Sequence, residues 1–334
     1  MSQKPAPSFA DLVQEFFGSY ALNQRALSPQ TIAAYRDTFV MMLNYAEKTK
    51  AIQYHHFKLT DLNAEFLAGF LDYLELERKN CVRTRNSRLA AIRSFLKFAA
   101  RRDLINLATI EQARTVPMKR FDRPMLGFVP HKQMLAIMDV PTDTWVGQRD
   151  RLMFSLLFNT GARVSEIIGV RVSDVELGPS NHIRLRGKGR KQRSLPLWKS
   201  TATAVRQWLK HNPQLHADTP LLPRRDGQAM TRVNVVLRLK LAVDAAANRY
   251  PELKEMRISP HIIRHSTAMC LLQSGIDPVE IALWLGHESP VTTHQYVEAD
   301  LAMKERALAR LKQPEIKQAR YRPPKGVMDF LTSL

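Results

Sequence analysis

Hydrophobic residues along the first part of the chain recur every three or four positions, as they do on one face of an α-helix. The stretch 84–100 shows this most clearly, and its apolar side is made of Leu89, Ile92, Leu96 and Ala99. The same spacing predicts helices that begin near Ser8 and Ser28 and a third helix over 63–74. We therefore expect residues 1–114 to form a helical domain.

Signals for helix starts accompany these apolar faces. Ser8 is followed three residues later by Asp11, the arrangement of a capping box, in which two side chains cap each other's backbone amides. Ser28 precedes Pro29, which pairs an N-cap residue with a proline at the first helical position. Each signal predicts where one of the helices begins.

The helical periodicity fails over 115–130, where three prolines, a glycine and several basic residues predict a linker. Helices are expected again near 131–139 and 147–159 and once more after about Ser200. Between them, alternating apolar and polar positions predict three short strands, namely Val172–Glu176, His182–Arg186 and Arg193–Leu197. The expected fold is mainly α with a small antiparallel β-sheet, and the second domain covers 131–312.

Three short helices are predicted between residues 259 and 296. A capping residue followed by proline opens each of them, as Ser259-Pro260, Asp277-Pro278 and Ser289-Pro290. Glu280 would complete a capping box in the second helix. Gly275 and Gly286 stand where a left-handed C-terminal cap would end the first two.

These helix starts place four candidate side chains on neighbouring small elements. His261 and Arg264 lie three residues apart on one helix face, His287 lies just past a helix end, and Tyr296 lies inside the third helix. A guanidinium, two imidazoles and a phenol in such an arrangement suggest a phosphate site with a possible nucleophile.

The charge balance points to a nucleic-acid partner. The chain has a formal net charge of +19, with 50 Lys and Arg against 31 Asp and Glu. Neutralising phosphates with basic side chains releases counterions and drives binding to DNA or RNA. Ribosome association or simple cationic solubility would account for the same charge.

Basic residues also cluster locally. Arg93, Lys97 and Arg101 run down one side of the predicted helix 84–100 at four-residue spacing. They form either a solvated face or a contact with the DNA backbone. Arg190 and Lys191, beside a glycine-flanked turn, are further candidates for DNA contact.

The expected location is cytoplasmic. Two cysteines, Cys81 and Cys270, provide neither a disulfide framework nor a zinc cluster and fit a reducing compartment. We expect no signal peptide from the polar start of the chain, and no membrane span, because no run of about 18 apolar residues occurs.

Five sequence elements follow one another in a specific order. They are Thr160-Gly-Ala-Arg163-Val-Ser-Glu166, Gly187-Lys188-Gly189, His261-Ile-Ile-Arg264-His, Leu285-Gly-His287 and Tyr296. This series resembles the tyrosine recombinase (phage integrase) family, which includes the Xer-type recombinases. The resemblance covers the whole second domain. The first domain, with its Ser28-Pro29-x-Thr31 helix start, is similar to the core-binding domain of that family.

The resemblance implies a set of roles. Catalysis would fall to Arg163, Lys188, His261, Arg264, His287 and the nucleophile Tyr296, with Glu166 as the supporting acidic residue. Ala162, where leucine is usual in the family, and Glu288 are departures that touch no catalytic position. No metal and no cofactor are expected.

The resemblance also implies a reaction and an assembly. Strands of double-stranded DNA would be cut and rejoined through a 3′-phosphotyrosyl link and a Holliday junction, by a homotetramer on synapsed sites, with possible accessory proteins. Integration or excision of a mobile element, or DNA resolution, would be the outcome. The tail 313–334 ends in an apolar patch of Val327, Met328, Phe330, Leu331 and Leu334, which would dock on a neighbouring subunit or fold back on its own domain.

Three other functions fit part of the pattern. The first is a metal-dependent hydrolase, because His261 and His265 have the four-residue spacing of zinc ligands on a helix. The segment lacks, however, the glutamate of a metallohydrolase motif. The chain could also be a catalytically idle DNA-binding protein of the same fold, or a relaxing enzyme similar to type IB topoisomerases.

Overall fold

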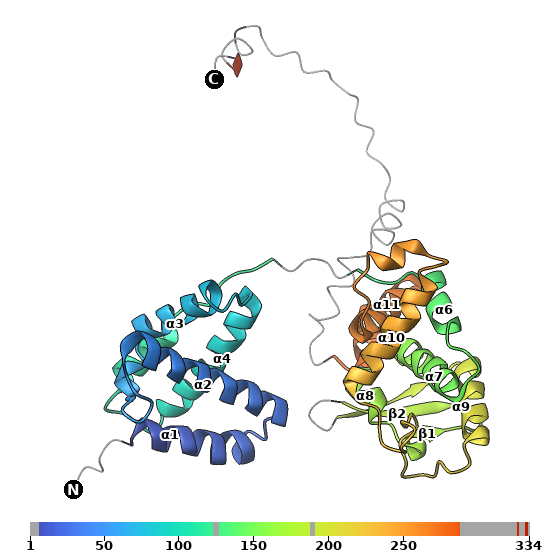
Figure 1. Ribbon diagram of the computed structural model, residues 1–334, viewed down its shortest axis with the longest axis horizontal. Helices are drawn as coiled ribbons and strands as arrows, with labels where there is room; N and C mark the ends of the chain where they lie inside the picture. The colour runs from blue at the N-terminus through green and yellow to red at the C-terminus, as the bar shows by residue number, and fades with distance from the viewer. Residues whose placement is uncertain (1–6, 123–126, 188–190, 288–325, 327–330, 333–334) are drawn as a thin grey trace. The chain divides into compact units, whose positions relative to one another are not determined.

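A computed structural model describes residues 7–122, 127–187 and 191–287, together with 326, 331 and 332. The chain divides into two compact units, Met1–Arg123 and Pro124–Leu334 (Figure 1). The division falls inside the proline-containing segment 115–130. Each unit has its own hydrophobic core.

All regular elements in the described part of the first unit are helical. Its elements are α1 (Phe9–Glu15), a π-helix (Phe16–Gln24), α2 (Pro29–Lys50), a short 3₁₀ turn (Leu59–Asp61), α3 (Ala64–Leu76), α4 (Val82–Ala99) and α5 (Leu107–Thr115). The predicted starts are confirmed. Ser8 and Asp11 form the capping box, and the Ser28 side chain accepts a hydrogen bond from the Thr31 amide.

Aromatic rings form the centre of this unit. Phe16 of the π-helix is fully buried, and its ring centroid lies 5.5 Å from that of Phe95 and 5.4 Å from that of Phe98 on α4. Phe39 of α2 lies 5.2 Å from Phe95 in an edge-to-face contact. Edge-to-face pairs contribute about 0.5–1.5 kcal/mol each beyond the area they bury. These contacts fix α2 and α4 around the π-helix.

The chain after α5 is fixed to α4 by hydrogen bonds. The Asn86 side chain donates to the Lys119 carbonyl (2.8 Å) and accepts from the Lys119 amide (3.1 Å). Arg85, which is 5% exposed, donates to the Pro117 carbonyl (3.1 Å). The first part of the predicted linker is therefore held on the surface of the first unit.

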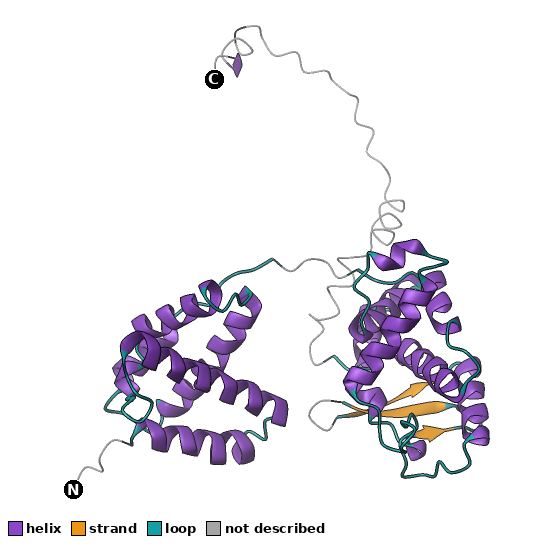
Figure 2. Ribbon diagram, viewed as in Figure 1, coloured by secondary structure: helices purple, strands orange, loops and turns teal. Residues whose placement is uncertain are grey.

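The second unit combines helices with one small sheet (Figure 2). Its elements are α6 (His131–Asp139), α7 (Trp145–Thr160), α8 (Val164–Ile168), a 3₁₀ turn (Val172–Asp174), β1 (Val175–Glu176), β2 (His182–Arg186), β3 (Gln192–Pro196), α9 (Lys199–His211), α10 (Arg232–Ala246), a 3₁₀ turn (Pro251–Lys254), α11 (Pro260–Gln273) and α12 (Pro278–Leu285). The predicted fold class, mainly α with a small antiparallel sheet, is confirmed.

The three strands are antiparallel in the order β1-β2-β3. The first is shorter than predicted, because the Asp174 carboxylate accepts a hydrogen bond from the Arg171 amide (3.0 Å) and closes a turn over Val172–Asp174. In the β2–β3 pair, Leu185 lies opposite Arg193. This register places Arg193 beside a buried position of the neighbouring strand.

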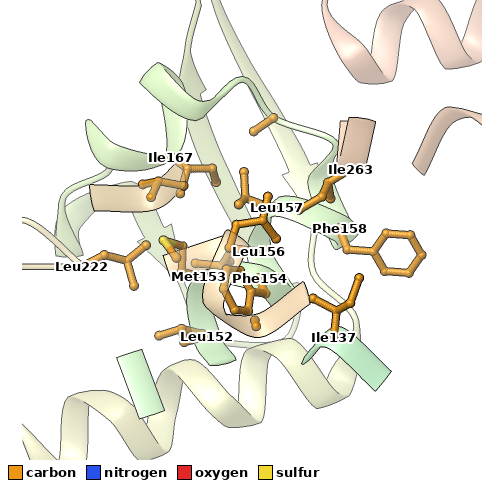
Figure 3. Packing of buried hydrophobic residues seen from close by; sticks show 14 of the residues in the cluster. Ile137, Leu152, Met153, Phe154, Leu156, Leu157, Phe158, Ile167, Leu222 and Ile263 are labelled. Carbon is orange, nitrogen blue, oxygen red and sulfur yellow. The ribbon is translucent and has the colours of Figure 1, made fainter. Parts of the chain in front are cut away.

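Helix α7 passes through the core of the second unit (Figure 3). Six of its apolar side chains are no more than 2% exposed, namely Leu152, Met153, Phe154, Leu156, Leu157 and Phe158. A helix that is apolar on nearly all sides is stable only inside a core. Its C-terminal end is therefore held firmly in place.

The two helices at the end of the described chain start and stop as predicted. Ser259 accepts a hydrogen bond from the Ile262 amide at the start of α11. Asp277 caps α12 through the Val279 amide rather than through a capping box with Glu280. Gly275 and Gly286 have φ values of 87° and 66°, as left-handed C-caps require. The third predicted helix, from Ser289, lies outside the described residues.

Candidate active site

Three helix ends meet in the second unit: the C-terminus of α7, the N-terminal half of α11 and the C-terminus of α12. Gly161 ends α7 at a φ of 59°, and a Cβ atom there would lie 2.5 Å from a methyl carbon of Leu285. Thr267 of α11 donates to the Phe158 carbonyl (2.8 Å). Only glycine combines this left-handed backbone with so close an approach.

Arg264 bridges two of these helix ends. Its side chain is nearly buried, with 3% of the residue exposed, and donates to the Gly161 carbonyl (2.8 Å) and to the Leu285 carbonyl (2.7 Å). Carbonyls at helix C-termini have no partner within the helix and carry partial negative charge. The Arg264 guanidinium therefore binds carbonyl oxygens that have no partner within their own helices.

Arg163 lies beside Arg264. It is the N-cap residue of α8, two residues after Gly161, and its guanidinium donates to the Gly286 carbonyl (3.3 Å). Both guanidiniums act on the imidazoles of His261 and His287, which places them at one site. About a third of the Arg163 side chain is exposed, at 37%. Arg163 thus presents positive charge toward solvent, while Arg264 lies buried.

Glu166 fixes Arg163 from the other side. Its carboxylate accepts from the Arg163 amide (2.9 Å) and from the Arg163 guanidinium (2.9 Å). Burial alone would raise the pKa of Glu166, but hydrogen bonds from Arg193 and Arg163, together with the Arg193 charge, lower that pKa below 4.5. Glu166 is consequently ionised at neutral pH, although its side chain is 2% exposed.

Arg193 on β3 completes this arrangement and was not among the predicted site residues. It donates to both oxygens of Glu166 (3.1 and 2.8 Å) and to the Trp284 carbonyl (2.9 Å). Three consecutive carbonyls at the end of α12, those of Trp284, Leu285 and Gly286, therefore accept from three different arginines. A sequence signal did exist, because strand alternation places Arg193 on the same face as Leu195.

The turn after α12 positions His287. With Gly286 in the left-handed conformation, the His287 amide donates back to the Ala282 carbonyl (2.9 Å), a bond typical of the Schellman motif. The imidazole therefore leaves the helix next to the carbonyls that bind the arginines.

Both imidazoles lie in the field of these arginines. Burial, and then Arg264, Arg163 and Arg193, lower the pKa of His287 to about 4. Partial burial of the ring, followed by Arg264 and Arg163, also lowers the pKa of His261 from its ordinary 6.5. Since both values lie below neutral pH, both rings are neutral there and can accept a proton or a hydrogen bond.

The structure brings together five of the predicted site residues: Arg163, Glu166, His261, Arg264 and His287. The predicted Lys188, Arg190 and Tyr296 lie outside the described residues. The roles of all the predicted site residues remain predictions.

The remaining candidates for DNA contact differ in their surroundings. Lys97, Arg101 and Lys191 are exposed. Arg93 is partly buried and donates to the Val116 carbonyl. Lys97 and Arg93 line an open hollow of about 530 Å³ on the first unit, together with Arg25 and Arg114.

His261 and His265 have different surroundings. His261 is exposed, whereas His265 is 3% exposed within the same helix. Among the residues that the structure describes, no group of three or more His, Cys, Asp or Glu side chains is placed to hold a metal ion.

Comparison with known proteins assigns the class. The model of the Phage integrase family matches residues 127–303, and that of the phage integrase N-terminal SAM-like domain matches residues 13–103. The chain belongs to the phage integrase family of tyrosine site-specific recombinases, as its motifs indicated.

Individual relatives agree with this assignment. A Sinorhizobium fredii protein named as an integrase/recombinase, y4rC, is 39% identical over 328 residues, which cover 98% of each chain. The tyrosine recombinase XerC of Pelobacter propionicus is 30% identical over 282 residues, covering 83% of this chain and 87% of that protein.

Solved structures share the fold. XerH recombinase bound to palindromic difH substrate matches with a TM-score of 0.68 at 19% identity, covering 86% of this chain and 81% of XerH. The Tn1549 transposon integrase in complex with transposon right end DNA matches with a TM-score of 0.68 at 15% identity, covering 89% and 98%. Within the described part of the chain, no helix combines the length and apolar character that crossing a membrane requires.

Proposed function

We propose that this protein binds double-stranded DNA, cuts one strand by attack of Tyr296 on a backbone phosphate, and rejoins the strand to a new partner. The observation that carries this proposal is the side-by-side placement of Arg163 and Arg264 on the carbonyls of Gly286 and Leu285. Two guanidiniums held at one site would fit the two non-bridging oxygens of a phosphodiester.

The chemistry of the reaction explains this residue choice. A phosphodiester is already negative, and attack by an oxygen nucleophile adds charge to its non-bridging oxygens. Guanidinium groups match such oxygens in a bidentate way and stay charged at any relevant pH. Removing one preorganised donor of this kind raises the barrier by about 2.7–4 kcal/mol in other enzymes. The buried base of the site provides that preorganisation here.

Proton transfer would be shared among three side chains. A tyrosine phenol has an ordinary pKa of about 10, so Tyr296 needs a base to become a nucleophile at neutral pH. The neutral imidazole of His261 suits that role, and that of His287 can donate a hydrogen bond to the phosphate. Lys188 would protonate the departing 5′-oxygen. The 3′-phosphotyrosyl bond formed would conserve the energy needed for rejoining, without ATP and without a metal ion.

Several observations support DNA as the partner. The net charge is +19, and the similar XerH and Tn1549 integrase structures are complexes with DNA. By analogy with its family, the protein would act as a homotetramer on two synapsed sites and pass through a Holliday junction. Movement of a mobile element, or resolution of joined DNA, would be the result.

The decisive experiment uses Tyr296→Phe. A DNA duplex selected from a random pool by binding to the full-length protein serves as substrate, with a nick that traps cleaved strands. Wild-type protein should form a covalent adduct at one phosphate, whereas Tyr296→Phe should bind equally well and form none. An adduct with Tyr296→Phe would overturn the assignment, and no adduct with wild type would indicate an idle DNA-binding protein.

A further inference from the structure

One guanidinium outside the predicted catalytic set connects three separate parts of the site. Arg193 comes from β3, Glu166 from α8 and Trp284 from α12, and Arg193 donates to both of the others. Its side chain is 15% exposed. The three contacts join the sheet to the two helices that hold the arginine pair.

Three of the five N–H donors of Arg193 bond to protein acceptors. Its Nε bonds to the Trp284 carbonyl (2.9 Å), while Nη1 and Nη2 bond to the two oxygens of Glu166 (3.1 and 2.8 Å). Each nitrogen thus has a protein partner. This geometry makes Arg193 a support for the anion site rather than a third ligand of the phosphate.

Packing around Arg193 is tight as well. A Cβ atom at Gly286 would lie 2.9 Å from its Nη1 and 3.2 Å from its Cζ. The guanidinium therefore packs directly against the turn whose carbonyl binds Arg163. A change in the Arg193 side chain should move this turn and the Glu166 carboxylate together.

We infer that Arg193 is a positioning residue. It fixes the position of the Arg163 guanidinium by bonding to Glu166 on one side and to the end of α12 on the other. A displacement of about 1 Å at a reacting group can lower a rate about a hundredfold. Lysine at this position keeps the charge but cannot make three bonds in a fixed plane. The inference rests on the function proposed above.

The test compares Arg193→Lys with wild type and with Arg186→Lys. Arg186 is a matched control, because it lies on the adjacent strand and pairs with the buried carboxylate of Asp174 (3.2 Å) instead of Glu166. On the nicked, selected duplex, Arg193→Lys should form the covalent adduct roughly a hundredfold more slowly, at unchanged DNA affinity. Arg186→Lys should react at the wild-type rate.

A second substrate separates positioning from general damage. In a methylphosphonate duplex, a methyl group replaces one non-bridging oxygen at the phosphate mapped from the wild-type adduct, so that the phosphate is uncharged. If Arg193 acts by placing Arg163, the difference between wild type and Arg193→Lys should shrink at least several-fold on this substrate. An undiminished difference would overturn the inference.

The partner residue provides an independent check. Arg193→Lys combined with Glu166→Gln should be no slower than the slower single variant, because both act through one carboxylate. Losses that multiply would overturn the inference. If Arg193→Lys fails to bind DNA, Arg193→Gln is tested in the same comparisons. Failure of both variants to bind would show that Arg193 is needed for the fold, and would overturn the inference.

The outcomes also separate this inference from the proposed function. If wild-type protein yields no adduct, the proposed function fails. If wild type yields the adduct and Arg193→Lys matches its rate, only the role of Arg193 fails.

Discussion

Two arginines share one carboxylate at the candidate active site, and a third binds the end of α12. Arg163 and Arg193 both bond to Glu166, and Arg264 lies on the next carbonyl of α12. Removing one partner from a buried ion pair leaves an uncompensated charge, which costs more than the pair contributes. Glu166 thus keeps two guanidiniums in place while the site as a whole retains positive charge for an anion.

This positive charge makes the stability of the protein depend on pH through His287. Its pKa is about 4 in the folded protein against 6.5 ordinarily, because of burial and the nearby Arg264, Arg163, Arg193 and His261. Below pH 6.5 the unfolded chain takes up a proton that the folded protein excludes. The free energy of unfolding should therefore fall as the pH drops from 6.5 toward 4.

Urea denaturation at pH 7, 6 and 5 checks this prediction. His287→Gln keeps a polar side chain that does not titrate, so its free energy of unfolding should fall less over that range than that of wild type. Parallel curves for the two proteins would contradict the prediction. His261, whose pKa is also lowered, should leave part of the dependence in place.

Residue identity alone could predict the arginine pair but not its support. Arg163 and Arg264 stand in motifs whose order is specific, so their position in the sequence was informative. Arg193 stands in a basic run in which several residues are exposed. Its role depends on the buried carboxylate of Glu166, and Arg193 reaches this carboxylate only when β3 pairs with β2. A charged residue on the apolar face of a strand is the sign that could have indicated it.

At the scale of the elements, local signals predicted helix starts well. Ser8, Ser28 and Ser259 cap helices as expected, because capping depends on a few neighbouring residues. The start of the first strand was wrong because Asp174 forms a local turn instead. The π-helix Phe16–Gln24 was not foreseen, since its fit depends on rings from α2 and α4.

The meeting of α7 and α12 depends on one glycine. Gly161→Ala would add a Cβ atom 2.5 Å from a Leu285 methyl carbon at a backbone φ of 59°. Left-handed backbone costs a residue with a side chain roughly 1–2 kcal/mol, and overpacking typically costs about 1–3 kcal/mol more. Gly161→Ala should therefore lower the free energy of unfolding by about 2–5 kcal/mol in a urea titration.

Gly178→Ala is the matched control for that measurement. Gly178 lies in the same unit, and a Cβ atom there would meet nothing within 4 Å. Its effect should stay within about 0.5 kcal/mol. A small effect of Gly161→Ala would show that the ends of α7 and α12 can separate at little cost.

At the scale of the whole molecule, both ends of the segment between the units are fixed. Lys119 is bound to Asn86 on the first unit, and the Val129 amide donates to the Ser266 hydroxyl of α11 (2.8 Å) on the second. Only residues 120–128 lie between these two fixed points. The tail 313–334 and its docking on a neighbouring subunit remain predictions.

The charge of the whole chain predicts salt-dependent DNA binding. A protein that makes six to ten phosphate contacts loses about 10³- to 10⁵-fold in affinity between about 50 and 200 mM salt. With a net charge of +19, we expect a fall in this range, measured by fluorescence anisotropy on the selected duplex. A flat response would contradict backbone contact.

The structure also ranks two residues of α4. Lys97 is exposed and Arg93 donates to the Val116 carbonyl, so Lys97→Gln should reduce the salt slope by about one and Arg93→Gln by less. The reverse order would show that Arg93 leaves Val116 to reach DNA.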